Sequence, residues 1–218
     1  MNEAPEYRRR VQEVSMSKGT KTGLIVLAII AVLGFMAYSA FVGAYNNIVT
    51  MEEGVTAQWG QVQNVYQRRS DLIPNLVATV KGYASHEADV LESVTQARSR
   101  VGGTVTVSDD ILNDPEAFKR YQQAQNELGG ALQRLLMVTE NYPELKANES
   151  FLALQDQLEG TENRITVERK RFNDAVRAYN TAIRRFPASL IANMGGFRTK
   201  AYFEADSNAQ SAPQVSFE

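Results

Sequence analysis

Residues 23–44 read GLIVLAIIAVLGFMAYSAFVGA, and no charged side chain occurs between Lys21 and Glu52. At ~1.5 Å per residue, a helix of this length covers roughly the 30 Å hydrocarbon core of a bilayer. A buried helix of a soluble domain seldom contains more than about 10–14 unbroken apolar residues. The stretch therefore predicts one transmembrane helix over residues 22–44.

A cleaved signal peptide is the alternative interpretation of this stretch. The apolar part of a signal peptide is ~7–15 residues long and is followed by a cleavage site with small residues. The stretch here is longer, and the small residues near Ala40 and Ala44 match such a site poorly. Its length favours a retained anchor.

The charges on the two sides of the stretch predict its orientation. Lys and Arg prefer the cytoplasmic side of a membrane span. The first charges after the stretch are Glu52 and Glu53, and no basic residue follows before Arg68. We therefore expect residues 1–21 to be a cytoplasmic tail, with the rest of the chain periplasmic or extracellular, in a single-pass protein of the inner (cytoplasmic) membrane. The basic residues of the tail are Arg8, Arg9, Arg10, Lys18 and Lys21.

Composition excludes several classes of protein. The chain has 23 basic and 25 acidic residues, and the part after the tail is mildly acidic. This argues against a nucleic-acid partner, which needs a clustered basic face. Cysteine is absent and His86 is the only histidine, which removes disulfides and most zinc and histidine-based catalytic sites. We expect no metal and no cofactor.

Apolar residues recur at spacings of three and four after the membrane stretch, which predicts helices almost throughout. Pro74 is expected to end a first helix near Arg69–Asp71 and to begin a second one. Proline lacks an N–H and constrains the residue before it, so it suits the first turn of a helix rather than its interior.

Two further helices complete the predicted domain. Asp114 and Pro115 are typical of a helix start, and the near-heptad apolar spacing after them is typical of coiled-coil packing. The fourth and longest helix is expected from about Asn148 to Phe186. Short connections make antiparallel neighbours, so the predicted fold is all-α, an N-terminal transmembrane helix followed by an up-and-down four-helix bundle over residues 45–203. Residues 204–218 are expected to be disordered.

Several strings of this sequence resemble the LemA family of bacterial membrane-anchored helical proteins. They include RRSDLIPNLV at 68–77, PELKAN at 143–148 and LEGTENRI at 158–165, and the resemblance covers about residues 45–203. It implies an N-terminal membrane helix and a bromodomain-like bundle of four antiparallel helices, with no established biochemical activity. Family members are often encoded beside membrane metalloproteases, which implies a role as a protease adaptor or envelope stress component. The 21 residues before the apolar stretch depart from the family, whose members usually begin almost directly with the span.

Charged and polar residues gather near the predicted first turn and along the fourth helix. One interpretation is a ligand site, and the other, which we favour, is a network that pairs across the bundle and fixes helix register. Two arginines beside a carboxylate lack a nucleophile or a histidine to act with them. The candidate network is Arg68, Arg69, Asp71, Glu159, Glu162, Asn163, Arg164 and Glu168.

Glu168 falls on the apolar stripe of the fourth helix, between Ile165 and Phe172. A buried carboxylate is costly unless it is paired, so we expect a partner, with Arg69 the favoured one and a basic residue of the second helix the alternative. A catalytic acid is the other interpretation of this position. An enzyme that uses Glu168 or the Arg68 and Arg69 pair is accordingly an alternative function.

Two asparagines and the end of the fourth helix also carry expectations. Asn173 and Asn180 are seven residues apart, so they share a helix face, and hydrogen bonds between helices are the favoured use for them. The fourth helix outreaches the second by about twelve residues, which brings its end towards the bilayer. Folding back onto the bundle is the alternative for that segment. The residues expected near the membrane are Tyr45, Leu190, Ile191, Met194 and Phe197.

The leading functional hypothesis is a membrane-anchored helical scaffold or interaction module of the cell envelope. Its expected partners are the membrane and other envelope proteins, and a homo-oligomer is compatible with the pattern. A third hypothesis assigns the Arg8–Arg10 run a contact with anionic lipid or a signalling partner.

Overall fold

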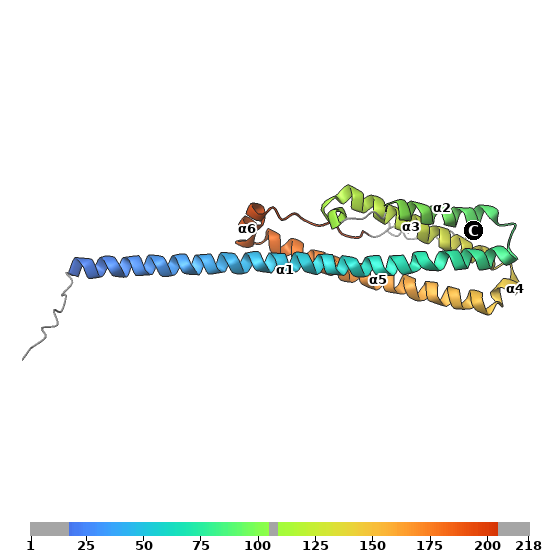
Figure 1. The fold of residues 1–218 in the computed structure, drawn as a ribbon, viewed down its shortest axis with the longest axis horizontal. Coiled ribbons are helices and arrows are strands. Elements are labelled where there is room, and N and C mark those ends of the chain that lie inside the picture. The colour runs from blue at the N-terminus through green and yellow to red at the C-terminus, as the bar shows by residue number, and fades with distance from the viewer. Residues whose placement is uncertain (1–17, 105–108, 205–218) are drawn as a thin grey trace, which may run out of the picture. The chain divides into compact units, whose positions relative to one another are not determined.

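The computed structural model describes residues 18–104 and 109–204, and every regular element in these residues is a helix. The chain divides into two compact units, Met1–Ala44 and Tyr45–Glu218, and we call the second unit the helical domain. The elements, labelled in Figure 1, are α1 (Lys18–Tyr83), α2 (Ala88–Thr104), the 3-10 helix η1 (Asp109–Asn113), α3 (Pro115–Thr139), α4 (Pro143–Lys146), α5 (Glu149–Arg184) and α6 (Ala188–Gly195).

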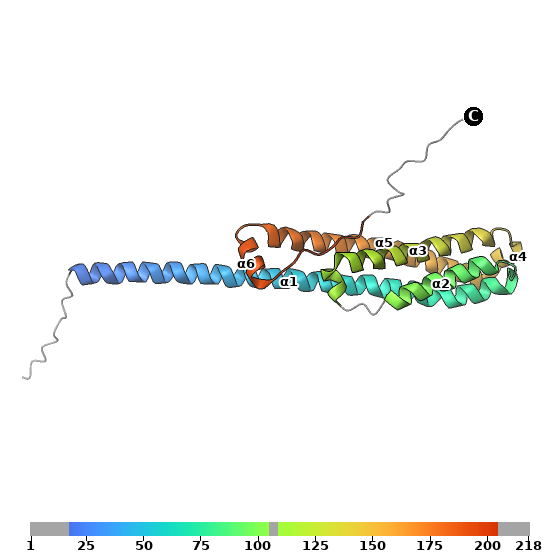
Figure 2. The same ribbon diagram turned by 90° about the horizontal axis from the view of Figure 1, so that it is seen from above.

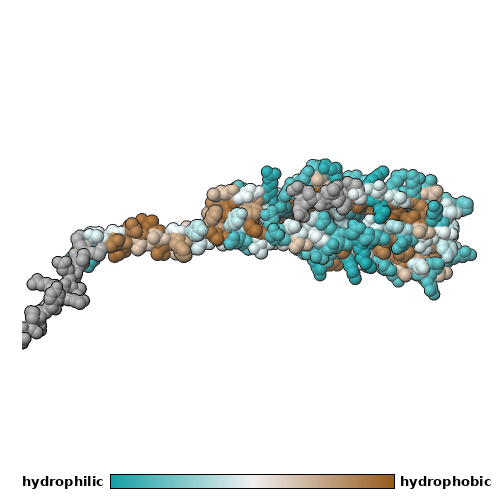
Figure 3. Space-filling view, viewed as in Figure 1, coloured by the Kyte–Doolittle hydropathy of each residue, from teal (hydrophilic) through white to brown (hydrophobic). Residues whose placement is uncertain are grey.

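The first unit contains the apolar stretch of α1. None of its most apolar window is buried, and large side chains such as Ile30 and Phe35 are 64% and 71% exposed. Figure 3 shows hydrophobic side chains along this part of the helix. The prediction of an all-α chain with one long apolar helix near its N-terminus is confirmed, and that helix is long and apolar enough to cross a membrane. The predicted tail, residues 1–17 in particular, and the predicted disordered end, apart from Glu204, lie outside the described residues.

The predicted helix boundary at Pro74 is wrong. α1 passes through Pro74 without a break and ends only at Tyr83, and the first turn between helices lies at residues 84–87. Residues of the predicted second helix are therefore divided between α1 and α2. As a consequence, Arg68, Arg69 and Asp71 lie inside a helix and not at a turn.

Packing explains why α1 tolerates the proline. An interior proline costs about 3 kcal/mol or more because it removes one backbone hydrogen bond and clashes with the carbonyl four residues earlier. The helix buries Ile73 directly before Pro74 and Leu76 and Val80 after it, and each such side chain contributes roughly 1.5–3 kcal/mol. Pro74 itself is exposed. Continuing the helix is thus favoured over breaking it.

The carbonyl that Pro74 leaves without its usual partner is that of Ser70, four residues earlier. Arg98 of α2 donates its Nε–H to this oxygen, with a nitrogen–oxygen distance of 3.2 Å. A side chain of the neighbouring helix thus replaces the missing backbone donor. Nothing in the local sequence around Pro74 predicts this contact, because the donor, Arg98, lies 28 residues after Ser70.

Side-chain caps begin α3 and α5, and the sequence predicts the one at Asp114 and a helix start near Asn148. Asp114 accepts hydrogen bonds from the backbone N–H groups of Glu116 and Ala117, each at 3.0 Å, ahead of Pro115. Asn148 accepts from the N–H of Phe151 at 3.0 Å. Each cap satisfies backbone donors that the first turn of a helix leaves unpaired.

The buried core of the helical domain has two parts of different composition. The first, which we call the aliphatic half, receives side chains from α4 and from α1, α2, α3 and α5, and these four lie side by side in Figures 1 and 2. Its fully buried members include Leu76, Val94, Leu128 and Leu135. Val, Leu, Ile and Ala predominate in it.

The second part, the aromatic half, is built around Trp59, whose side chain is fully buried. Its ring lies 5.4–6.1 Å, centroid to centroid, from the rings of Phe118, Tyr121, Phe172 and Phe203. Phe203 belongs to the extended residues 197–204, which we call the strap, and α2 contributes no ring because it contains none. Figure 2 shows the strap returning from α6 towards α3.

Candidate functional site

Arg69 lies at the centre of the buried polar contacts of the helical domain and is only 3% exposed. Its Nη1 lies 2.9 Å from Oε1 of Glu162 on α5. Its Nη2 donates to the side-chain oxygen of Gln125 on α3 and to the backbone carbonyl of Gln125, the latter at 3.1 Å. The guanidinium also lies 5.1 Å from the ring centre of Tyr66. One side chain of α1 therefore joins three helices.

The position of Arg69 on α1 explains this arrangement. Tyr66 and Ile73 are three and four residues away on the buried stripe, so the arginine must enter the core with them. A buried charge is stable only with partners, and the carboxylate and two oxygens of Gln125 provide them. The Glu162 side chain is 42% exposed, so solvent screens this ion pair in part.

Apart from Glu162, the members of the predicted network do not contact Arg69. Asp71 is exposed and accepts a hydrogen bond of 2.7 Å from Gln67, one turn earlier on the same helix. The remaining residues are exposed on the surfaces of α1 and α5, and they are Arg68, Glu159, Asn163 and Arg164. The structure thus brings together Arg69 and Glu162 from that set.

The expected pairing of Glu168 with Arg69 is wrong. Glu168 accepts a hydrogen bond of 2.6 Å from Gln58 of α1 and forms an ion pair of 2.7 Å with Arg171, one turn later on α5. Its side chain is 15% exposed. Glu168 lies six residues, or about 9 Å, beyond Glu162 along α5, which places it opposite an earlier turn of α1. The carboxylate is therefore compensated by two donors, and neither belongs to the predicted second helix.

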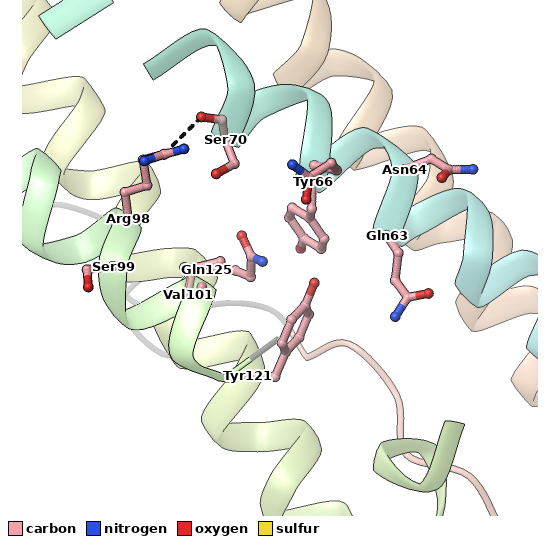
Figure 4. Close-up of a pocket in the computed structure, with 11 residues that line it drawn as sticks. Gln63, Asn64, Tyr66, Ser70, Arg98, Ser99, Val101, Tyr121 and Gln125 are labelled. Atoms are coloured by element: carbon pink, nitrogen blue, oxygen red, sulfur yellow. Dashed lines mark hydrogen bonds between the residues drawn. The ribbon is translucent and has the colours of Figure 1, made fainter. Parts of the chain in front are cut away.

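A polar recess of about 890 Å³ opens between α1, α2 and α3. Figure 4 shows Tyr66 and Tyr121 directed into it, with their ring centres 5.8 Å apart and the planes at 77°. Burial raises the pKa of both tyrosine hydroxyls, so they stay neutral and available as hydrogen-bond donors well above neutral pH. Arg98 and Gln125 also line the recess.

The lining of this recess suits hydrogen bonding better than covalent chemistry. Among the described residues that line it are amides, hydroxyls and one arginine, with no carboxylate and no histidine. The sequence analysis did not predict this recess. The polar residues Gln63, Asn64, Gln67 and Ser70, which follow one another on one side of α1, are the signal that points to it.

Amide side chains hold the strap against the helices. Asn180 donates to the carbonyl of Lys200 and accepts from the N–H of Lys200, both at 2.9 Å. Asn173 makes the same two bonds with the backbone of Phe203, both at 2.9 Å. Gln122 of α3 repeats the pattern with Glu204 at 2.7 and 3.3 Å. The expectation that the two asparagines bond to another helix is wrong, because their partner is an extended segment.

The spacing of the two asparagines matches the strap. Seven helical residues advance about 10.5 Å, and three extended residues advance about 10 Å. Asparagine also offers a donor and an acceptor on one group, as a backbone residue does, so each side chain can replace a neighbouring strand. Two asparagines seven residues apart on a helix face are thus a readable signal for a clamp on extended backbone.

Lys200 fixes the strap to two more elements. Its side chain is 6% exposed, and its Nζ lies 2.6 Å from a carboxylate oxygen of Glu52 on α1 and 2.6 Å from Oδ1 of Asn113 in η1. It also lies 5.6 Å from the ring centre of Tyr179. The sequence prediction missed Lys200, because a single lysine near the end of the chain carries no periodic signal.

The residues predicted near the membrane divide into two groups. Leu190 and Met194 are 57% and 78% exposed, and Tyr45 is 41% exposed. Ile191 is 6% exposed and packs inside the helical domain. Phe197 packs edge-on against Tyr45, with the ring centres 5.6 Å apart.

Within the described residues, no group of three or more His, Cys, Asp or Glu side chains is arranged to hold a metal ion. The polar contacts described above join helices or hold the strap. Their common chemical feature is hydrogen bonding and charge compensation between segments of the chain.

Comparison with known proteins identifies relatives over most of the chain. Residues 58–217 match the sequence model of the LemA family. Magnetosome protein MamQ 2 of Paramagnetospirillum magneticum is 26% identical over 204 residues, which covers 87% of this chain and 74% of the relative. Magnetosome protein MamQ of Magnetospirillum gryphiswaldense is 26% identical over 203 residues, with 86% and 74% covered. Protein LemA of Metamycoplasma hominis is 23% identical over 195 residues, with 88% and 84% covered.

Proposed function

This chain belongs to the LemA family, and from that premise we propose that it is a membrane-anchored helical scaffold of the bacterial cell envelope. In this proposal residues 22–44 anchor the protein in the inner membrane, and the helical domain binds other envelope proteins on the outer side. The observation that carries the proposal is the apolar part of α1, whose large side chains are exposed along its length. Such a surface is better suited to lipid than to water, which supports the anchor.

The contacts inside the helical domain support a structural role for its buried polar groups. Arg69, Lys200 and Asn180 are all more than nine-tenths buried, and each bonds to other segments of the chain. Groups used in this way fix the relative position of the segments. A rigid domain with fixed surface residues is what a scaffold needs.

We propose further that α1, α2, α3 and α5 form an up-and-down bundle of the bromodomain-like kind. The contacts of Arg69 with Glu162 and of Gln58 with Glu168 support opposite directions for α1 and α5. The relatives named as magnetosome proteins support a role at a membrane. The cytoplasmic side of the tail is supported by its basic residues and by the acidic Glu52 and Glu53 after the stretch.

Site-specific photocrosslinking in intact cells tests the scaffold proposal. A photoreactive amino acid is placed at one of three exposed apolar positions of the helical domain, Met137, Leu152 or Val167. We expect at least one of the three positions to form one discrete adduct, with the same partner protein in repeated experiments. The other positions should form this adduct more weakly or not at all. The anchor is tested in parallel by deleting residues 22–44, which should abolish the adduct, and by replacing them with an unrelated transmembrane helix, which should restore it.

Several results would contradict the proposal. Identical adduct patterns from all three positions, or none from any, would contradict a specific scaffold. An adduct that survives deletion of the apolar stretch would contradict the need for an anchor. A substrate turned over by the purified full chain would replace the scaffold with an enzyme.

A further inference from the structure

The end of the helical domain carries apolar side chains that the domain does not cover. Phe186, Leu190 and Met194 are 81%, 57% and 78% exposed, and we call these three residues the α6 patch. Figure 3 shows hydrophobic surface gathered over α6. The opposite side of α6 packs inward through Ile191 and Ala192, which are 6% and 2% exposed. α6 therefore carries apolar side chains on both its inward and its outward side, and only the inward ones are covered by the domain.

Positive charge surrounds the α6 patch. Arg184 and Arg185 precede it, Arg198 follows it, and all three are exposed. No acidic residue occurs between positions 175 and 203. The acidic residue in contact with this segment, Glu52, is paired with Lys200. An exposed apolar helix flanked by arginines is complementary to a lipid surface that carries negative charge.

Chain connectivity places the α6 patch near the proposed anchor. Phe197, directly after α6, packs on Tyr45, and a Cβ at Gly195 would lie 3.5 Å from the Tyr45 ring. Tyr45 is the first residue after the apolar stretch 23–44. If that stretch crosses the bilayer, Tyr45 is the residue at which the chain leaves the bilayer. The end of α6 is then separated from this residue only by the contact between the Tyr45 and Phe197 side chains. Gly196, in the left-handed conformation with φ of 74°, ends α6 and turns the chain back towards this contact.

We infer that the α6 patch inserts into an anionic lipid surface beside the anchor and gives the helical domain a second membrane contact. This inference rests on the proposed membrane anchoring. Interfacial helices bury their apolar side about 5–10 Å into the boundary between headgroups and acyl chains, and the arginines remain among the headgroups. The anchor keeps the patch at high local concentration next to the surface, so three apolar side chains suffice for contact. The contact fixes the height and tilt of the helical domain over the bilayer.

Fluorescence quenching in reconstituted vesicles tests this inference with the full chain. The sequence contains no cysteine, so one introduced cysteine carries one environment-sensitive fluorophore. The test position is Met194→Cys, and the matched control is Met137→Cys, an exposed methionine of α3 in the same domain. Val32→Cys, inside the apolar stretch, reports whether the anchor is inserted. Vesicles of phosphatidylcholine and phosphatidylglycerol contain lipids with quenchers at shallow or deep positions.

We expect the fluorophore at 194 to be quenched more by shallow than by deep quenchers, the one at 32 more by deep quenchers, and the one at 137 by neither. Quenching at 32 together with a water-like signal at 194 would overturn the inference and leave the anchor intact. Equal quenching at 194 and 137 would also overturn it, because the whole domain would then lie on the lipid. A water-like signal at 32 would overturn the anchor itself.

Charge provides a second, independent arm of the test. Each basic side chain near an anionic surface favours contact by about fivefold. Replacing Arg184, Arg185 and Arg198 with Gln should therefore reduce quenching at 194 in vesicles with phosphatidylglycerol, and have little effect in phosphatidylcholine alone. The same variant should leave quenching at 32 and the helix content unchanged. If quenching at 194 is independent of both lipid charge and the arginines, the assigned anionic surface is wrong.

Discussion

The aliphatic and aromatic halves of the helical domain bury their cores by different means. In the aliphatic half side chains of α1 to α5 meet, and Val, Leu and Ile fill the space between the helices. In the aromatic half α2 contributes no ring, and the strap with Phe203 packs on Trp59, Phe118 and Phe172 instead. The periodic pattern of apolar residues in the sequence therefore predicts the aliphatic half. The aromatic half is held together by aromatic rings and by amide side chains that bind a non-helical segment, and periodicity does not predict these contacts.

Removing the ring of Trp59 should have the largest effect. Trp59→Ala is expected to lower the free energy of unfolding by about 3–5 kcal/mol, because it leaves a cavity among four other rings. In hydrogen exchange, the strap amides should lose protection. Leu135→Ala in the aliphatic half should cost a similar amount without exposing the strap. Equal loss of strap protection in both variants would show that the halves are not distinct.

The asparagine clamps should show a graded effect along α5. Asn180→Ala is expected to cost about 1–3 kcal/mol, because it leaves a buried strap N–H and carbonyl without partners. Asn173→Ala should cost less, since that site is half-buried, and Asn163→Ala, at an exposed site, should change stability by no more than about 0.5 kcal/mol. The measurement is denaturant unfolding of the full chain in detergent. Equal changes in the free energy of unfolding for all three variants would contradict a role of Asn180 and Asn173 in holding the strap.

These two halves also explain how far the sequence could predict the fold. Asp114, Pro115 and Asn148 identify helix starts because a cap acts within a few residues of itself, and the structure has those starts. At Pro74 the local sequence predicts a helix boundary that the structure does not have. The cost of the proline is local, but what offsets it is the burial of Ile73, Leu76 and Val80 and the donor from Arg98 of another helix. Local rules are reliable where the compensating contact is local too.

The polar contacts illustrate a second limit, which is helix register. Sequence periodicity places Arg69, Glu162 and Glu168 near core faces, yet a shift of six residues along α5 decides whether Arg69 meets Glu162 or Glu168. Six residues are about 9 Å along the axis, and side-chain spacing within one helix contains no information about its neighbour. Lys200 and the strap lay beyond prediction because an extended segment of eight residues has no period long enough to detect.

Arg69 should couple to Glu162 and not to Glu168. In a double-mutant cycle, Arg69→Met and Glu162→Gln are expected to show an interaction of about 1 kcal/mol, a modest value because the glutamate is 42% exposed. The cycle with Glu168→Gln, which serves as the control, should be additive within about 0.5 kcal/mol. Coupling of Arg69 to Glu168 instead would mean that the register of α1 and α5 is different.

A small effect is also expected at Arg98. Arg98→Ala is expected to cost about 0.5–1.5 kcal/mol, because the Ser70 carbonyl loses its donor. In a Pro74→Ala background the cost should fall, since the backbone N–H of residue 74 then bonds to that carbonyl. Thermal unfolding of the four variants measures the difference. An Arg98→Ala effect that does not depend on residue 74 would disprove the replacement of the missing backbone donor.

In the proposed arrangement, residues 22–44 hold the helical domain on the outer side of a membrane, and thiol labelling measures this topology. Single cysteines at Met137, on the helical domain, and at Ser17, before the apolar stretch, are exposed in turn to a membrane-impermeant thiol reagent on intact cells whose inner membrane is sealed. We expect labelling at 137 before permeabilisation and at 17 only after it. Labelling at 17 first, or at both positions only after permeabilisation, would contradict the proposed arrangement.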